Sequence, residues 1–322
     1  MGNLELVPLM HARNGGLIVD QLTKSYGSKT VVEGISFTVP TGTVAGFVGP
    51  NGSGKSTTLR MMIGHARPDS GRALFDGSPF PALRSPGRTV GVLLDAAAQH
   101  PGRSVVETAY LAGLMIGVTR KRVLACLEAV GVESVAKKRV GALSLGMRQR
   151  LGIAIAVLGA PRFLILDEPA NGLDPEGIQW LRQFLRGFAD HGGTVVVSSH
   201  QLSEVAAAAD SIVVIDRGRL SAVGVGTATN PASILVRSSD DVLLHETLSR
   251  AGFAVSIAEN GGLSVEGDAF DVGRVAFERG ILLGHLAPHE SSLEEAFLAA
   301  THGEYAGLGG ERLLDFVRGG GR

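Results

Sequence analysis

The sequence has little cysteine, almost no net charge and no long apolar run. One cysteine in 322 residues, Cys126, excludes an internal disulfide framework and fits a reducing compartment. A formal net charge of −1 gives no general attraction to nucleic acid or to an anionic membrane surface, so no nucleic-acid partner is expected. No stretch approaches the roughly 18 uninterrupted apolar residues of a membrane-spanning helix. If the protein works at a membrane, another chain must supply the spanning segments.

What the chain does contain is a globular composition, 44% hydrophobic and 19% charged, with enough residues for one large or two medium domains. Short β-branched runs from Leu17 to Pro40 predict an antiparallel, hairpin-like entry. Four later segments, TVAGFVG, TVGVLLD, RFLILDEP and TVVVSSH, contain continuous apolar runs, with helical patterns between them. Because continuous runs are typical of strands buried on both faces, they predict a mostly parallel sheet covered by helices.

The sequence further predicts two domains joined by a linker. The first is an α/β domain at 16–226, in which residues from about 97 to 160 are expected to be helical. The composition then shifts, and the segment GVGTATNPA is typical of a linker. After it, strand and helix patterns follow the order βαββαβ with a closing helix, SLEEAFLAATHG, which predicts a small α+β accessory domain at 232–302. The two ends are predicted to be a flexible extension, residues 1–15, and a tail, residues 303–322.

A glycine-rich segment, GPNGSGKST, follows the first buried strand and precedes a helix. It matches the phosphate-binding pattern GxxxxGK[ST] in the structural context that makes this pattern credible. The glycines allow the backbone to wrap phosphates, Lys55 places a positive charge on the β- and γ-phosphates, and the Ser56 hydroxyl is a ligand for Mg²⁺. The predicted ATP-binding residues of this loop are Gly49, Pro50, Asn51, Gly52, Ser53, Gly54, Lys55, Ser56 and Thr57.

Two acidic residues end another buried strand in the segment FLILDEP. Parallel α/β sheets bind ligands at the carboxyl ends of their strands, which is where Asp167 and Glu168 fall. Asp167 is a candidate Mg²⁺ ligand, and Glu168 is a candidate base that orients and deprotonates the attacking water. His200 ends the strand VVVSSH and is able to donate a hydrogen bond to a γ-phosphate. Glu168, His200 and Lys55 are therefore the predicted catalytic residues.

A second loop, GALSLGMRQRLG, runs directly into an apolar helix but has no nucleophile, base or metal-ligand cluster beside it. The N-terminus of such a helix offers free backbone N–H groups and a partial positive charge, which favour an anion. The residues of this loop alone do not identify the anion or the molecule that carries it.

Five segments together resemble the nucleotide-binding subunits of ABC transporters. GPNGSGKST, LSLGM, LILDEP, GLD at residues 172–174 and SSH occur in that family's order, within about residues 17–225. The resemblance implies a P-loop NTPase fold with an antiparallel β subdomain and an α-helical subdomain. It also implies that Tyr26 stacks on adenine, and that Ser144 and Gly146 belong to the signature motif, which contacts ATP held by a second nucleotide-binding domain. A homodimer of these domains is therefore expected, with Asp174 in the D-loop.

Two positions depart from the family's pattern. Leu145 and Met147 replace a glycine and a glutamine of the signature motif, whereas Ser144 and Gly146 keep the hydroxyl and the backbone contact. At the position of the Q-loop glutamine, after VGVLL, stands Asp95. A carboxylate is a hard oxygen ligand that can approach Mg²⁺ or its waters, but it cannot donate a hydrogen bond. The predicted metal ligands are Ser56, Asp167 and Asp95.

The segments LSLGMRQRLGIAIAVLG, EPANGLDPEGI and SLEEAFLAAT resemble the ATPases of bacterial drug, antibiotic and lantibiotic exporters. This resemblance implies a subunit at the cytoplasmic face of the membrane, attached through a separate permease, that uses ATP and Mg²⁺. Two alternatives remain: a soluble ABC-type ATPase acting on nucleic acid or ribosomes, and an importer subunit. A single cassette without coiled-coil heptads argues against the first, and the resemblance to exporters disfavours the second.

Overall fold

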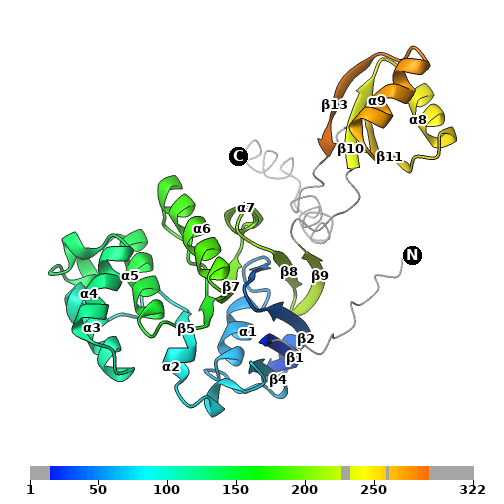
Figure 1. Cartoon of the computed structure of the whole chain (residues 1–322). Helices are drawn as coiled ribbons and strands as arrows, with labels where there is room; N and C mark the ends of the chain where they lie inside the picture. Colours follow the sequence, from blue (N-terminus) through cyan, green and yellow to red (C-terminus); the bar gives the residue numbers. More distant parts are fainter. Residues whose placement is uncertain (1–14, 226–232, 259–260, 290–322) are drawn as a thin grey trace, which may run out of the picture. The chain divides into compact units, whose positions relative to one another are not determined.

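The computed structural model describes residues 15–225, 233–258 and 261–289, and these residues form two compact units (Figure 1). The first unit runs to Gly226, and the second lies within Thr227–Leu298. The predicted N-terminal extension, closing helix and tail lie outside the described residues, apart from Gly15. The predicted linker also lies outside them, except for Gly224 and Val225, which belong to a strand. Each unit is described below by itself.

An antiparallel sheet opens the first unit. Strands β1 (Gly16–Tyr26) and β2 (Lys29–Pro40) form a hairpin, and β4 (Ser70–Phe75) pairs with the other edge of β1, giving the order β2-β1-β4. The hairpin confirms the predicted antiparallel entry. The sequence analysis did not predict β4, which returns to this sheet after the helix that follows the glycine loop.

A six-stranded sheet forms the centre of the first unit, with the order β5-β6-β7-β3-β8-β9. The first five strands in this order pair in parallel, and β9 joins the edge antiparallel to β8. The mostly parallel sheet was predicted, and the antiparallel edge strand was not. The strand bounds are β3 Val44–Val48, β5 Val90–Leu93, β6 Phe163–Leu166, β7 Thr194–Ser199, β8 Ser211–Asp216 and β9 Arg219–Val225.

The main core lies between these two sheets. Helix α1 (Lys55–Met62) contributes Leu59 and Met62 to it, 0% and 1% exposed, and contacts β1, β2 and β4. Two aromatic pairs tie the sheets together: Phe37 with Phe47, at a ring separation of 5.6 Å, and Phe75 with Phe163, at 5.2 Å. Burial of rings of this size provides much of the stability of a core. The core therefore fixes α1, and the loop before it, against the central sheet.

Helices α6 (Pro175–Asp190) and α7 (Leu202–Val205) pack on β3 and β7. A separate helical part, α3 (Val105–Met115), α4 (Arg120–Ala129) and α5 (Leu145–Val157), joins the sheet where α5 contacts β5 (Figure 1). One further short helix, α2, spans Pro86–Thr89, and short 3-10 turns lie at 80–82, 133–135 and 140–142. Cys126 of α4 is 4% exposed, and this burial raises the pKa of its thiol.

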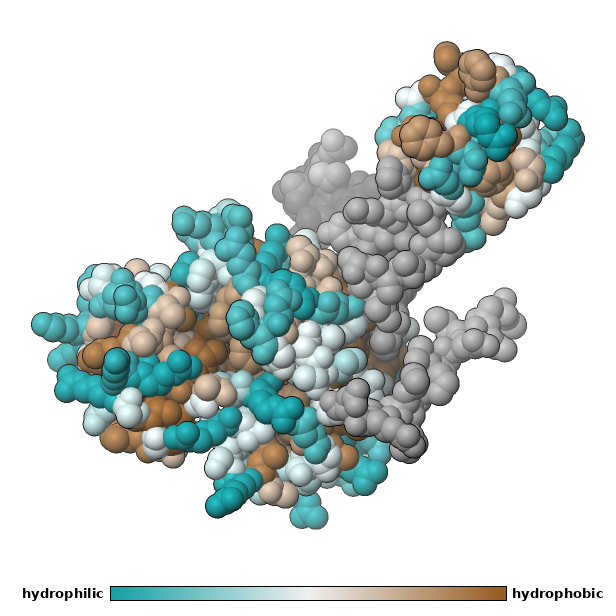
Figure 2. All heavy atoms as spheres, in the orientation of Figure 1, coloured by the Kyte–Doolittle hydropathy of each residue, from teal (hydrophilic) through white to brown (hydrophobic). Residues whose placement is uncertain are grey.

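The second unit is a four-stranded antiparallel sheet with the order β11-β12-β10-β13, together with two helices. Buried residues of β10, β12 and both helices form its own core, which includes Val236, Leu248 and Val265. Apolar residues also reach the surface of this unit (Figure 2). The elements are β10 (Ser233–Ser238), α8 (Asp241–Arg250), β11 (Val255–Ile257), β12 (Leu263–Glu266), α9 (Ala269–Glu278) and β13 (Leu283–His289).

The observed architecture confirms the predicted α/β fold class, with its antiparallel sheet, its helical part and a small α+β unit. Across the residues that the structure describes, no helix combines the length and the apolar character needed to cross a membrane.

Candidate functional site

Three loops meet at one edge of the central sheet because β6, β7 and β3 are parallel neighbours. The glycine loop follows β3, Asp167 follows β6, and His200 follows β7. The carboxyl ends of parallel strands lie on the same side, so residues that are distant in the sequence come together there. The topology therefore assembles the predicted site from three separate segments.

The glycine loop is shaped by positions that exclude a side chain. A Cβ on Gly49 would lie 2.1 Å from the carbonyl oxygen of Ile215, and Gly54 has a φ of 107°, in the left-handed region. Gly54 is also the N-cap of α1, and no side chain caps the first turn of this helix. The backbone N–H groups of that turn therefore have no side-chain acceptor, which suits an anionic ligand.

Lys55 is the buried cation of the site, with a side chain only 5% exposed. Its ammonium group donates hydrogen bonds to the carbonyl oxygens of Gly49 at 2.7 Å and Pro50 at 3.2 Å. The same nitrogen lies 3.4 Å from Oε1 of Glu168. The loop thus holds the lysine, and a carboxylate balances its charge.

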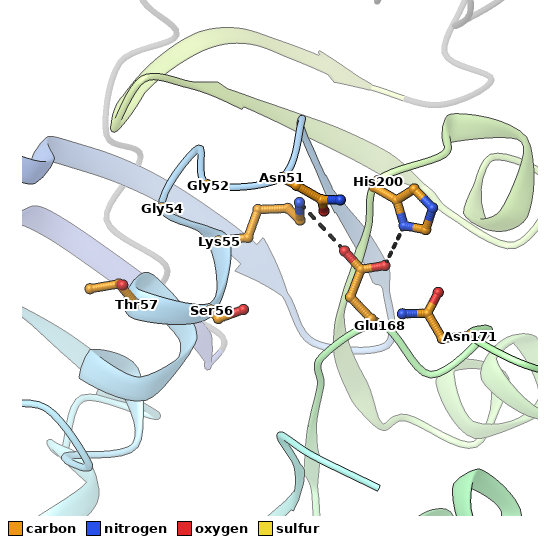
Figure 3. A pocket seen from close by; sticks show the side chains of 9 residues that line it. All are labelled: Asn51, Gly52, Gly54, Lys55, Ser56, Thr57, Glu168, Asn171 and His200. Carbon is orange, nitrogen blue, oxygen red and sulfur yellow. Dashed lines mark hydrogen bonds and ion pairs between the residues drawn. The ribbon is translucent and has the colours of Figure 1, made fainter. Parts of the chain in front are cut away.

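Glu168 lies between two partners (Figure 3). Its Oε1 faces Lys55, and its Oε2 lies 2.7 Å from Nδ1 of His200. The Glu168 side chain is 19% exposed and that of His200 is 31% exposed, so both are shielded but reachable from solvent. The structure therefore brings the three predicted catalytic side chains into one contiguous group.

These groups line a cavity of about 280 Å³, with residues of the glycine loop on one side and Glu168 and His200 on the other (Figure 3). The sequence analysis did not predict one lining residue, Asn171, which follows Glu168 by three positions. Its N–H donates to the Glu168 carbonyl at 3.2 Å, closing a tight turn after β6. The asparagine and glycine in PANG, which favour turns, were a signal for this position. The lining residues are Asn51, Gly52, Gly54, Lys55, Ser56, Thr57, Glu168, Asn171 and His200.

The donors available for Mg²⁺ are oxygen atoms. The Ser56 hydroxyl lines the cavity. Asp167 precedes Glu168 in the sequence and is 7% exposed, and it is not among the residues that line the cavity. The Oδ1 of Asp167 accepts a hydrogen bond from the Ser198 hydroxyl at 2.5 Å, which fixes the carboxylate. A hydroxyl and a carboxylate form a hard donor set that fits Mg²⁺. Asp95 is exposed, does not line the cavity, and accepts from the N–H of Ala97 at 2.7 Å in a turn.

Tyr26 lies at the end of β1 and is 55% exposed. It does not line the cavity. Lys24 lies over its ring, with Nζ 5.4 Å from the ring centroid, and donates to Asp69 at 2.8 Å. This hydrogen bond from Lys24 holds the pKa of the Asp69 carboxyl below its usual value. An open aromatic face with a cation beside it is compatible with stacking of a base.

The predicted signature residues lie at the start of α5 and do not line the cavity. Ser144 is exposed and caps the helix, since its hydroxyl accepts the N–H of Met147 at 3.2 Å. Gly146 is buried, and a Cβ there would lie 2.8 Å from the carbonyl oxygen of Gly172. Asp174 caps α6 by accepting from Gly177 at 2.8 Å. The first turn of α5 therefore packs directly on the segment that leads into α6.

A second carboxylate approaches the site after His200. Glu204 of α7 accepts a hydrogen bond from the Ser199 hydroxyl, and its backbone carbonyl accepts one from Arg182 of α6 at 3.1 Å. Among the described residues, one group of three potential metal-binding side chains occurs, and it consists of Glu168, His200 and Glu204, with ligand atoms within 4.8 Å of one another. We interpret this group as a hydrogen-bond network, because Lys55 and Ser199 already occupy its carboxylates. The sequence analysis did not predict Glu204.

The fold and the site define a P-loop ATPase. Comparison with known proteins identifies the particular kind. A family model described as ABC transporter matches residues 32–171. Two further models match: an AAA domain (putative AbiEii toxin, Type IV TA system) at 139–206, and a domain of unknown function (DUF8746) at 232–294.

Relatives with assigned names narrow the family to one branch. The chain is 39% identical over 204 residues to the lantibiotic transport ATP-binding protein SrtF of Streptococcus pyogenes, covering 63% of this chain and 88% of that one. It is 33% identical over 247 residues to the linearmycin resistance ATP-binding protein LnrL of Bacillus subtilis (strain 168), covering 75% and 78%. A solved ATP-binding subunit of an ABC transporter superposes with a TM-score of 0.59 at 28% identity, covering 65% and 90%.

The chain belongs to the ABC transporter family, and it is an ATPase whose hydrolysis of ATP is coupled to transport. The predicted resemblance to the ATPases of antibiotic and lantibiotic exporters is confirmed.

Proposed function

We propose that this ATPase energises the export of a drug, antibiotic or peptide-like substrate through a separate membrane permease, at the cytoplasmic face of the membrane. Two nucleotide-binding domains sandwich ATP between them in this proposal. The names of the relatives, which refer to lantibiotic transport and linearmycin resistance, support the substrate class. The substrate itself binds the permease, so this chain supplies the energy.

One observation carries the ATPase part of the proposal. The Glu168 carboxylate stands between Lys55 and His200 at the edge of a cavity that the glycine loop lines (Figure 3). A carboxylate in this position is within reach of a water molecule in the cavity, and the contacts with Lys55 and His200 on its two sides orient it. A purely structural ion pair would not require a glycine loop opposite it.

Each residue has a role in this scheme. The backbone N–H groups of the glycine loop and Lys55 bind the β- and γ-phosphates, and Lys55 offsets charge that develops on them. Glu168 orients the attacking water and accepts its proton, while His200 donates a hydrogen bond to the γ-phosphate. Tyr26 stacks on the adenine ring. Ser56 and Asp167 would hold Mg²⁺, with Asp95 at the Q-loop position, and the ion would supply neutralisation of phosphate charge.

The start of α5 serves a second copy of the chain in this proposal. Ser144 is exposed, and its hydroxyl hydrogen stays available because the oxygen is the acceptor in the helix cap. Ser144 and Gly146 would therefore contact the γ-phosphate of ATP bound to the partner, and Asp174 would lie in the D-loop beside them. A homodimer of nucleotide-binding domains follows.

The substitution Glu168→Gln tests the proposed base. It preserves the shape of the side chain but cannot accept a proton, so turnover should fall by roughly two to four orders of magnitude. ATP binding should persist, and bound ATP should accumulate on the chain. Glu176→Gln, an exposed glutamate of α6, is the charge-matched control and should leave turnover unchanged. Near-normal turnover of Glu168→Gln, measured as phosphate release at saturating ATP, would refute this assignment.

We also propose that the α+β accessory domain, predicted at 232–302, is separable from the nucleotide-binding domain at 16–226. The separate core of the second unit supports this division. Strand β9 ends at Val225, so a chain truncated after Gly226 keeps the central sheet complete. This fragment should fold cooperatively and bind ATP with an affinity within about threefold of the full chain, because each unit has its own core. A fragment that is insoluble or binds no nucleotide would overturn the division.

A further inference from the structure

Glu168 has an unusual backbone. Its φ is 49°, in the left-handed region that residues with a side chain rarely adopt. Such a conformation persists only where the surroundings hold it in place, and strained residues of this kind gather at functional sites. The conformation directs the Glu168 side chain to the same point as Lys55 and His200 (Figure 3). The groups that hold this backbone therefore bear on where the carboxylate points.

The N–H of Glu168 is held by a buried hydroxyl. It donates to Oγ of Ser198 at 2.9 Å, and Ser198 is 0% exposed. The same hydroxyl donates to Oδ1 of Asp167. Ser198 comes from β7, two residues before His200, so one side chain links the ends of two neighbouring strands.

The carbonyl of Glu168 is held by a buried amide. Gln149 is 4% exposed, and its Nε2 donates to the Glu168 carbonyl at 3.1 Å, beside the N–H of Asn171. The Oε1 of Gln149 is buried without a hydrogen-bond partner. Burying an amide with one end unsatisfied is unfavourable, whereas an apolar side chain of similar size would avoid that cost. The bond to Glu168 is the favourable interaction that the structure gives this side chain.

Gln149 also connects Glu168 to the start of α5. It lies on α5 five residues after Ser144, and the first turn of that helix packs on the segment at Gly172. Helices move as rigid elements, so a displacement of the α5 start is transmitted to the Gln149 side chain. The amide is thus a direct link between the surface that would meet a partner's ATP and the base of the same chain.

We infer that Ser198 and Gln149 are positioning residues that clamp the Glu168 backbone, so that the placement of α5 sets the direction of the Glu168 carboxylate. The inference rests on the proposed function, in which Glu168 is the base. Neither clamp residue touches the cavity, so neither is expected to contribute to ATP affinity. Their contribution should appear in the rate of hydrolysis alone.

The test compares Gln149→Leu and Ser198→Ala with the unchanged chain, measuring kcat, KM, ATP affinity and melting temperature at one protein concentration. Misdirection of a catalytic group by about 1 Å costs on the order of 100-fold in rate, so kcat should fall by roughly 10- to 100-fold. ATP affinity should stay within about twofold. Ser198→Thr retains a hydroxyl and should recover most of the rate. If the leucine variant fails to fold, Gln149→Met repeats the test with a side chain whose stem is unbranched, like that of glutamine.

A double variant separates clamping from general damage. If Gln149 acts through the base, adding Gln149→Leu to Glu168→Gln should cause no further loss of the residual rate. An unchanged kcat in Gln149→Leu and Ser198→Ala would overturn the clamp, and so would an equal further loss in the double variant. Near-normal turnover of Glu168→Gln alone would instead refute the proposed function. The two failures are therefore distinguishable in one set of proteins.

Discussion

The two helices that follow the predicted phosphate-contacting loops, α1 and α5, begin in different ways. The first turn of α1 follows Gly54 and has no side-chain cap, whereas Ser144 caps the first turn of α5. Among described helices of eight residues or more, α1 alone lacks a side-chain cap. The caps of the others are Ser104 of α3, Thr119 of α4, Ser144 of α5, Asp174 of α6, Asp240 of α8 and Asp268 of α9.

The difference teaches how one chain can carry two kinds of phosphate contact. At α1 the N–H groups have no side-chain acceptor, and Lys55 adds a buried positive charge, so this start can bind phosphate within its own chain. At α5 the serine oxygen already satisfies one N–H, so the contact it offers outward is the hydroxyl hydrogen. In the proposed function, the start of α1 holds the nucleotide of its own chain, and the start of α5 contacts a nucleotide held by a second copy.

Removing the charge at α1 should have the larger effect. Lys55→Ala deletes the buried cation, and a charge-assisted contact of about 3 kcal/mol corresponds to roughly 100-fold in affinity. ATP binding should weaken by about that factor and turnover should disappear with it, as measured by calorimetric titration and phosphate release. Lys121→Ala, an exposed lysine of α4, is the control and should change neither. If Lys55→Ala bound ATP normally, the two helix starts would not differ as described.

Bulk at the α5 start should affect turnover but not binding. Ser144→Arg places a long cationic side chain where a partner's γ-phosphate would dock, so turnover should fall by about 100-fold or more while ATP affinity stays within about twofold. The unchanged chain should also lose turnover per molecule on dilution, because dimer formation follows mass action. Turnover that is independent of concentration and insensitive to Ser144→Arg would remove the proposed partner contact.

The sequence allowed the sheet edge and its glycine loop to be predicted, because backbone conformation and strand burial restrict which residue types can occupy these positions. Gly49 and Gly54 occupy places where a Cβ does not fit or where φ is positive, and the apolar runs before Asp167 and His200 mark buried strands. These constraints act locally, so a single sequence displays them. The order of the strands, β5-β6-β7-β3-β8-β9, was not predicted.

The supporting contacts were not predicted, since they join segments with no common pattern. Gln149 reaches Glu168 across 19 positions and Ser198 reaches it across 30. A buried glutamine in an apolar helix and a serine in a strand look like ordinary residues until the fold places them. The edge strand β9 was missed for a similar reason: its pairing partner β8, and not its own composition, makes it a strand. Asp95, exposed and held in a local turn, shows that a motif position does not by itself place a side chain in the cavity.

The smallest expected effect is that of Ser144→Ala, which tests whether Ser144 contacts a partner's phosphate in addition to capping α5. Loss of a serine or threonine N-cap costs about 0.5–2 kcal/mol, which for a domain of this size lowers the melting temperature by roughly 2–4 °C per kcal/mol. Ser144→Ala removes the cap hydrogen bond to Met147, and Thr119→Ala removes the one to Arg122, so the melting temperatures of the two variants should fall by similar amounts.

Turnover should differ between the two variants. Ser144→Ala also removes the hydroxyl hydrogen that would reach the partner's phosphate, which is worth several-fold in rate. Thr119 caps α4 and contacts no part of the cavity, so Thr119→Ala should keep full turnover at temperatures where it is folded. Equal turnover in both variants would contradict the proposed contact with the partner's phosphate and would leave helix capping as the role of Ser144.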